Sequence, residues 1–196
     1  MGPLVPLFYY DLASPECYLA AERLADVLGV VPEWTPVQAA RLPAGDLTAF
    51  RCAEERDIHM LEIERLAAAR GMQPLRWPAR WPAEVELALR VATYAKQIGR
   101  GVAFSLAAFR QAFAAGRDLS TPDGVVIAAA ACEMHPTAVL RSAETRGVRE
   151  ALAAATEEAR AAGATRVPAL RVGDEVFHGD EGLEAAAQAL AGTAAR

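Results

Sequence analysis

The chain has 196 residues and a mass of 20.8 kDa, with 53% hydrophobic and 23% charged residues, a composition typical of a globular protein. Its 20 Lys and Arg against 25 Asp and Glu give a net charge of −5, so it lacks the basic excess that nucleic acid or anionic lipid requires. The first ten residues carry no positive charge, and no uncharged run approaches the roughly 20 residues of a membrane-spanning helix. We therefore expect a cytoplasmic protein that binds neither nucleic acid nor a membrane.

The N-terminal 40 residues are predicted to form a strand, a helix and a second strand. The short aromatic run Leu7 to Asp11 predicts a buried strand. Ser14, which precedes a proline, suits the N-cap of a helix, and the apolar spacing after it predicts a helix that buries Cys17 and ends at Gly29. Glu33 to Gln38 predicts the second strand. A strand–helix–strand unit of this length implies a parallel pair of strands.

From Leu47 to about Gly163 the apolar residues recur only at helical spacing, which predicts five or six helices. Within this segment Thr121, next to a proline, predicts a helix start. Ser105 is predicted to cap a helix over Leu106 to Ala115.

The C-terminal part returns to the spacing of strands. Val167 to Val172 and Glu175 to His178 predict two strands joined by a Gly173-Asp174 hairpin turn, and Glu181 to Leu190 predicts a final helix. The helix before them, roughly Gly147 to Ala162, is the expected crossover connection back to the sheet.

The order of these elements predicts an α/β protein with a thioredoxin-like fold, a four-stranded mixed sheet interrupted by an all-helical insertion. Residues 1–40 and 145–196 would form the thioredoxin-like domain, and residues 41–144 the insertion domain. The Val167-Pro168 bond opens a strand directly after a loop, where such sheets place a cis proline.

The three cysteines are widely spaced and form no C-x-x-C pair, which favours reduced thiols over a disulfide framework. We expect Cys17, Cys52 and Cys132 to pack in the core or at its boundary. Cys132 and His135 have a spacing that suits a metal, but no second pair accompanies them and His59 is isolated, so no metal is expected.

Four stretches of the sequence carry a resemblance to a known family: residues 8–23 (F-Y-Y-D-L-A-S-P-E-C-Y-L-A-A-E-R), Gly71 to Pro82, Ala103 to Ser120, and Arg166 to Gly179. They resemble the DsbA-like thioredoxin superfamily, and within it the branch of 2-hydroxychromene-2-carboxylate isomerases and kappa-class glutathione transferases. Members of this branch are commonly dimers, so the resemblance implies a homodimer.

The resemblance implies an enzyme that binds glutathione or another low-molecular-weight thiol and uses it to isomerise or conjugate an electrophilic substrate, aromatic ones included. Ser14 matches the catalytic serine of the family, which donates a hydrogen bond to the glutathione sulfur and favours its thiolate. Val167 and Pro168 match the loop that pairs with the cysteinyl part of glutathione. Asp180 and Glu181 fall where the family holds the γ-glutamyl group.

The sequence also departs from the family pattern. Gly182 replaces a common arginine, and Glu16 replaces the usual aromatic residue and puts a charge beside the thiol position. In the unusual run R-W-P-A-R-W-P, packing between helices alone would explain the tryptophans. Because the family's insertion faces the active site, at least one of Trp77 and Trp81 is expected to touch the substrate pocket. His178 adjoins that site and could carry protons, but a solvent-facing histidine at the hairpin end is the favoured interpretation.

Two other functions remain open from the residues alone. Disulfide oxidoreductases of this superfamily carry C-x-x-C where this chain has Ser14-Pro15-Glu16-Cys17, and a serine cannot form their mixed disulfide. Cys17 is therefore expected to pack in the core beside the substrate pocket rather than to act in redox chemistry. The altered stretch Asp180 to Gly182 leaves a non-catalytic thioredoxin-like binding module as the second alternative.

Overall fold

The structure, a computed structural model, describes residues 5–45 and 49–194. Four strands form one mixed sheet in the order β2-β1-β3-β4. They are β1 (Leu7–Tyr10), β2 (Glu33–Pro36), β3 (Ala169–Val172) and β4 (Glu175–His178). β2 runs parallel to β1, while β3 runs antiparallel to both β1 and β4. The predicted four-stranded mixed sheet is confirmed.

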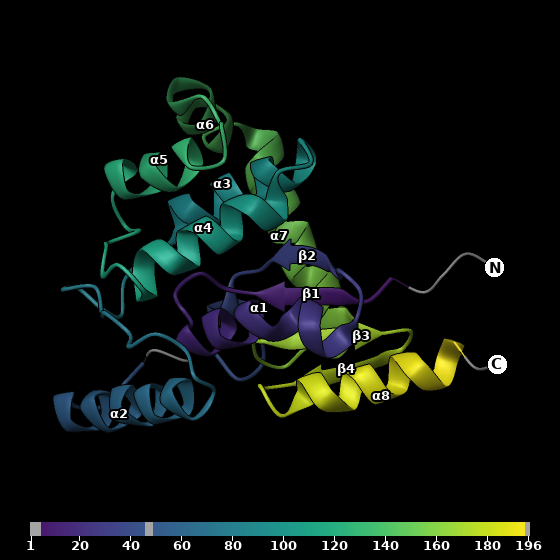
Figure 1. The fold of residues 1–196 in the computed structure, drawn as a ribbon. Coiled ribbons are helices and arrows are strands. Elements are labelled where there is room, and N and C mark those ends of the chain that lie inside the picture. The colour runs from purple at the N-terminus through teal and green to yellow at the C-terminus, as the bar shows by residue number, and fades with distance from the viewer. Residues whose placement is uncertain (1–4, 46–48, 195–196) are drawn as a thin grey trace.

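Helices cover both faces of this sheet (Figure 1). α1 (Pro15–Leu28) packs against α8 (Gly182–Ala194), which also contacts β3 and β4, while α7 (Arg146–Ala161) contacts β2 from behind. Because both faces are covered, three consecutive residues of β1, residues 8–10, are all buried. As predicted, α1 ends at Gly29, whose φ of 66° favours glycine.

The remaining helices lie between β2 and β3 in the chain, as the insertion predicts. They are the short 3₁₀ helix η1 (Ala39–Arg41), α2 (Ala53–Ala69), α3 (Glu86–Gln97), α4 (Gly101–Phe113), α5 (Pro122–Ala130) and α6 (Pro136–Ala143). Together with α7, the described residues hold six α-helices where five or six were predicted. Leu47, the expected start of the helical segment, lies outside the described residues, and the domain boundaries stay predictions.

Aromatic side chains join the sheet to the insertion. The rings of Phe8, Tyr10 and Trp34 contact one another with centroids 5.1–5.6 Å apart, and Phe109 of α4 lies 5.7 Å from Tyr10. Edge-to-face and offset contacts of this kind add to the stabilisation by buried apolar area. The sheet and the insertion therefore share one hydrophobic core.

Two predictions about single residues were wrong. Ser105 does not cap a helix, because α4 already begins at Gly101 and its buried stripe runs through Ser105, whose hydroxyl bonds with Tyr10. Cys52 is exposed rather than buried, because it occupies the N-cap position where α2 starts in solvent. Cys132 is buried, as expected.

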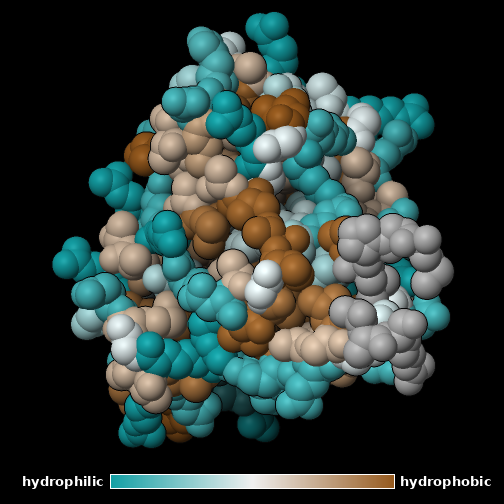
Figure 2. All heavy atoms as spheres, turned by 45° about the vertical axis from the view of Figure 1, so that its right-hand side comes forward, coloured by the Kyte–Doolittle hydropathy of each residue, from teal (hydrophilic) through white to brown (hydrophobic). Residues whose placement is uncertain are grey.

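On the face of the molecule shown in Figure 2, hydrophobic side chains gather near the middle, and hydrophilic side chains surround them. None of the helices in the described ranges has both the length and the hydropathy needed to cross a membrane.

Candidate functional site

Ser14 begins α1, as the sequence predicts. Its backbone is extended, with φ −87° and ψ 117°, and its Oγ accepts a hydrogen bond of 3.1 Å from the Cys17 N–H. Pro15 follows as the first helical residue, where its missing N–H costs nothing. The positive dipole end of the helix lies here and favours an anion by roughly 0.3–1 kcal/mol. Its first N–H groups already have partners, because Cys17 N–H donates to Ser14 Oγ and the Glu16 N–H to the Glu16 carboxylate.

The hydroxyl proton of Ser14 is already in use. Ser14 Oγ donates to Glu16 Oε2 over 2.8 Å, and Glu16 Oε1 pairs with His59 Nε2 of α2 over 3.1 Å. Burial raises the pKa of Glu16, but the hydrogen bonds from His59, from a backbone N–H and from Ser14 outweigh this and leave that pKa below its usual value. The hydrogen bond with Glu16 raises the pKa of His59. The start of α1 thus carries a Ser14–Glu16–His59 network.

Aromatic rings surround the histidine of this network. The His59 ring stacks on Trp81 with centroids 6.0 Å apart and planes 7° apart, and Phe50 lies 5.4 Å away. Trp81 Nε1 in turn donates to the Ala13 carbonyl, next to Ser14, over 3.1 Å. Trp81 therefore makes two contacts at the start of α1. Its indole nitrogen is hydrogen-bonded to the loop before Ser14, and its ring is stacked on His59.

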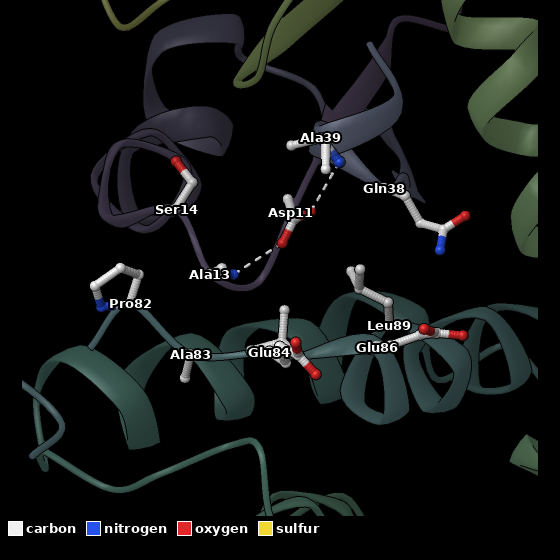
Figure 3. A pocket seen from close by; sticks show the side chains of 12 residues that line it. Asp11, Ala13, Ser14, Gln38, Ala39, Pro82, Ala83, Glu84, Glu86 and Leu89 are labelled. Carbon is white, nitrogen blue, oxygen red and sulfur yellow. Dashed lines mark hydrogen bonds between the residues drawn. The ribbon is translucent and has the colours of Figure 1, made fainter. Parts of the chain in front are cut away.

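A cleft of about 520 Å³ opens beside Ser14, between the end of β1 and the start of α3 (Figure 3). Its lining residues are Asp11, Ala13, Ser14, Gln38, Ala39, Ala40, Pro82, Ala83, Glu84, Val85, Glu86 and Leu89. This volume suits a small molecule. The lining holds three carboxylates and, among the described residues, no basic side chain, so the cleft is negatively charged.

Hydrogen bonds fix the wall of the cleft that the sheet supplies. The buried Asp11 carboxylate accepts from the Ala13 N–H and from the Ala39 N–H, each over 2.9 Å (Figure 3). It thereby ties the loop before α1 to the segment after β2. In Figure 3 the Ser14 hydroxyl points toward α1 rather than toward Pro82 across the cleft.

Cys17 lies on the buried face of α1, as predicted. Its side chain is 0% exposed, and burial raises the pKa of its thiol. A thiol in this state is a poor nucleophile, because the thiolate is the reactive form.

The Val167-Pro168 bond is cis, which confirms that prediction. β1 and β3 pair through Tyr9 and Ala169, and continuing this antiparallel register places Pro168 across from Tyr10 and Val167 across from Asp11. The loop thus adjoins the segment that leads into Ser14. The Trp81-Pro82 bond is also cis, which the sequence reasoning did not anticipate.

The two acidic residues after β4 differ in their surroundings. Asp180 is only 14% exposed, accepts two hydrogen bonds of 2.9 Å from Arg23 Nη1 and also pairs with Arg70. Glu181 is 81% exposed, and its nearest cation, Arg166, lies 3.8 Å away. Arginines therefore neutralise the charge of Asp180, whereas Glu181 presents its carboxylate to solvent.

The four side chains predicted to lie at the substrate pocket are all outside the lining of this cleft: Cys17, Trp77, Trp81 and His178. Trp77 contacts Trp81 at a centroid distance of 4.5 Å and donates from Nε1 to Glu64. His178 Nε2 accepts from the Thr165 N–H over 3.0 Å, and burial lowers the pKa of its imidazole. His178 thus braces the loop before β3.

Sequence reasoning missed several residues of this region. It treated His59 as isolated, and it did not single out Arg23, Arg70 or the cleft residues Glu84 and Glu86. No local pattern marks them, because each meets the site only through the path of the folded backbone. Among the described residues, no three His, Cys, Asp or Glu side chains are grouped so as to hold a metal ion.

Known structures share this architecture. A 2-hydroxychromene-2-carboxylate isomerase superposes with a TM-score of 0.81 at 19% identity, covering 97% of this chain and 96% of the isomerase. A probable DsbA oxidoreductase from Streptomyces coelicolor superposes with a TM-score of 0.80 at 21% identity, and the alignment covers 98% of this chain and 91% of the oxidoreductase. The cytosolic disulfide reductase DsbM from Pseudomonas aeruginosa, solved with GSH, superposes with a TM-score of 0.69 at 15% identity, and the alignment covers 98% of each chain. At these identities the likeness shows a shared fold.

Comparison with curated proteins yields no match to the sequence. The family model of the DSBA-like thioredoxin domain, however, matches residues 7–191. Since this match spans nearly the whole chain, the protein belongs to the family of DSBA-like thioredoxin domains.

Proposed function

We propose that the protein is an enzyme that binds glutathione or another low-molecular-weight thiol at the start of α1 and adds it reversibly to an electrophilic small molecule. Reversible addition permits isomerisation, and addition without release gives conjugation. The observation that carries the proposal is Ser14, a serine at the N-cap of α1 on the wall of a cleft of about 520 Å³. The positive dipole end of the helix favours the negative charge that develops on the sulfur as the thiol adds to its substrate.

The same residue argues against a disulfide oxidoreductase. Thiol–disulfide exchange needs a nucleophilic thiol at the exposed helix start, and Ser14 supplies an oxygen there. Cys17 does not replace it, because the sulfur is fully buried and its pKa is raised.

The cleft supports a particular kind of electrophile. Val85 and Leu89 give it an apolar side, while Asp11, Glu84 and Glu86 give it negative charge. An uncharged or cationic electrophile suits this lining better than a carboxylate does, because like charges repel at short range. The substrate is thus proposed to differ in charge from a chromene carboxylate.

The thiol ligand is proposed to run from Ser14 along the Val167-Pro168 loop toward the residues after β4. Because two arginines neutralise Asp180, the exposed Glu181 carboxylate is the acid proposed to take an ammonium group of the ligand. Glutathione carries such an ammonium in its γ-glutamyl part.

Calorimetric titration with glutathione tests the proposal. The wild type should bind, and Ser14→Ala should lose most of that binding because no hydroxyl remains at the sulfur position. Ser142→Ala, in α6 away from the cleft, is the matched control and should bind like the wild type. Since losing an N-cap costs about 0.5–2 kcal/mol, thermal melting must first show that Ser14→Ala is folded.

Two results would contradict this function. Insulin reduction by the wild type would favour the oxidoreductase. Absence of binding to glutathione and to other small thiols, together with no insulin reduction, would favour the non-catalytic binding module.

A further inference from the structure

The hydrogen bonds of Ser14 determine what its hydroxyl offers a ligand. A serine hydroxyl has one proton and two lone pairs. Ser14 gives its proton to Glu16 Oε2 over 2.8 Å, and one lone pair accepts from the Cys17 N–H over 3.1 Å. Ser14 therefore has no proton left for a thiolate. Its remaining lone pair can accept a hydrogen bond from the S–H group of a ligand, which must compete for it with the neighbouring Cys17 thiol.

Glu16 is held firmly in this position. Its second oxygen pairs with His59 Nε2 over 3.1 Å, and the His59 ring is in turn stacked on Trp81. On α2, Glu62 also acts on His59 and raises its pKa. On α1, the buried Cys17 thiol lies near Ser14 and is affected by the charges of Glu16 and Asp11.

Building on the function proposed above, we propose that Glu16, fixed by His59, is a positioning residue that keeps a bound thiol protonated until the electrophile arrives and then receives its proton through Ser14. This role differs from that of a serine that only donates a hydrogen bond to a resting thiolate. It also explains why a carboxylate at the residue after Pro15 is compatible with thiol chemistry.

The S–H bond breaks as the sulfur electron pair forms a C–S bond with the electrophilic carbon of a conjugated carbonyl compound. The thiol proton moves to Ser14 Oγ while the Ser14 proton moves to Glu16 Oε2, and the π electrons of the substrate move onto its carbonyl oxygen. When the C–S bond breaks again, both protons return. No oxidant, reductant or metal takes part.

The weak basicity of Glu16 fits this sequence of events. Its pKa lies below the usual value, so its carboxylate does not take the proton of a resting thiol. It becomes neutral only while the C–S bond forms. A thiol held in this way resists oxidation and stray electrophiles, because the thiol is far less reactive than the thiolate.

A thiol introduced into the chain reports on this network without any bound ligand. Ser14→Cys places a sulfur at the N-cap, and the pH dependence of its alkylation by iodoacetamide under reducing conditions gives its titration midpoint. Mass spectrometry of the peptide that contains position 14 separates this reaction from that of the exposed Cys52. The titration midpoint of the introduced cysteine is then measured again in double variants, which combine Ser14→Cys with one further substitution each.

Removing the charge of Glu16 should lower that midpoint. We expect Glu16→Gln to shift it down by about one to three pH units, the effect of a unit charge a few ångströms away between the limits of bulk water and a protein surface. His59→Gln should shift it up, because Glu16 then loses the hydrogen bond from His59 that offsets part of its negative charge. Asp26→Asn removes an equal charge further along α1 and should leave it unchanged. An unchanged or raised midpoint in Glu16→Gln, or a lowered one in His59→Gln, would overturn the role of Glu16.

The proposed function is tested separately by titration of glutathione. If the midpoints shift as expected but no thiol binds, the proposed function fails while the electrostatic effect of Glu16 stands. If glutathione binds, its thiolate absorbance near 240 nm at pH 7 should be absent in the wild-type complex and appear in the Glu16→Gln complex. Thiolate in the wild-type complex would refute the inference while leaving glutathione binding intact.

Discussion

At the scale of single residues, Cys17 and Cys52 differ sharply although both are unpaired thiols. Cys17 is fully buried with a raised thiol pKa, and Cys52 is exposed at the start of α2. In the native protein we therefore expect an aromatic disulfide reagent to modify Cys52 rapidly and Cys17 only after denaturant is added. The rates are read from the absorbance of the released thiolate, with peptide mapping to assign them.

The Cys52→Ala variant serves as the control, because it keeps only the buried thiols of Cys17 and Cys132, which should react slowly with the reagent. If it still showed one thiol reacting at the rate of a free cysteine, and mapping placed that reaction at Cys17, the core position of Cys17 would be refuted. The oxidoreductase alternative would then gain support.

At the scale of elements, α5 depends on the absence of a side chain at one position. A Cβ on Gly124 would lie 1.9 Å from the Asp118 carbonyl oxygen, while the Gly124 N–H donates to the Thr121 cap. Gly124→Ala must shift the α4–α5 connection, so it should lower the free energy of unfolding by about 1–3 kcal/mol, measured by urea denaturation.

A second glycine gives the matched comparison. A Cβ on Gly147, in the first turn of α7, meets nothing within 4 Å. Gly147→Ala should therefore raise the free energy of unfolding, by about 0.5–1 kcal/mol from the lower entropy of alanine. Equal effects of the two substitutions would contradict the close approach at Gly124.

At the scale of the whole molecule, one buried hydrogen bond joins the sheet to the insertion. The Tyr10 hydroxyl of β1 bonds with Ser105 Oγ of α4, both side chains are buried, and burial raises the pKa of Tyr10. Tyr10→Phe leaves Ser105 without this partner, so we expect it to cost about 1–3 kcal/mol of stability. Thermal and urea unfolding measure the loss.

Tyr94→Phe is the control for this prediction. Tyr94 is half-buried on α3, and its hydroxyl makes no hydrogen bond within the described residues, so the substitution should change stability by less than about 0.5 kcal/mol. A Tyr10→Phe variant as stable as Tyr94→Phe would show that the Tyr10–Ser105 hydrogen bond does not contribute to holding the sheet and the insertion together.

The sequence by itself determined the features that depend on neighbouring residues. Ser14 caps α1, Gly29 ends it, Thr121 starts α5 and the turn after Val172 joins β3 to β4. Each follows from backbone preferences or from hydrogen bonds that span only a few residues, and these are readable in the order of side chains. The order of such elements was enough to predict the thioredoxin-like fold with its helical insertion.

Only the tertiary structure decided which distant side chains meet. It paired Glu16 with His59, surrounded Asp180 with arginines and turned Ser105 from a predicted helix cap into the buried partner of Tyr10. These contacts depend on the path of the backbone between the residues, which no local preference encodes. The serine of the candidate site was therefore predictable from sequence, whereas the groups that control its proton were not.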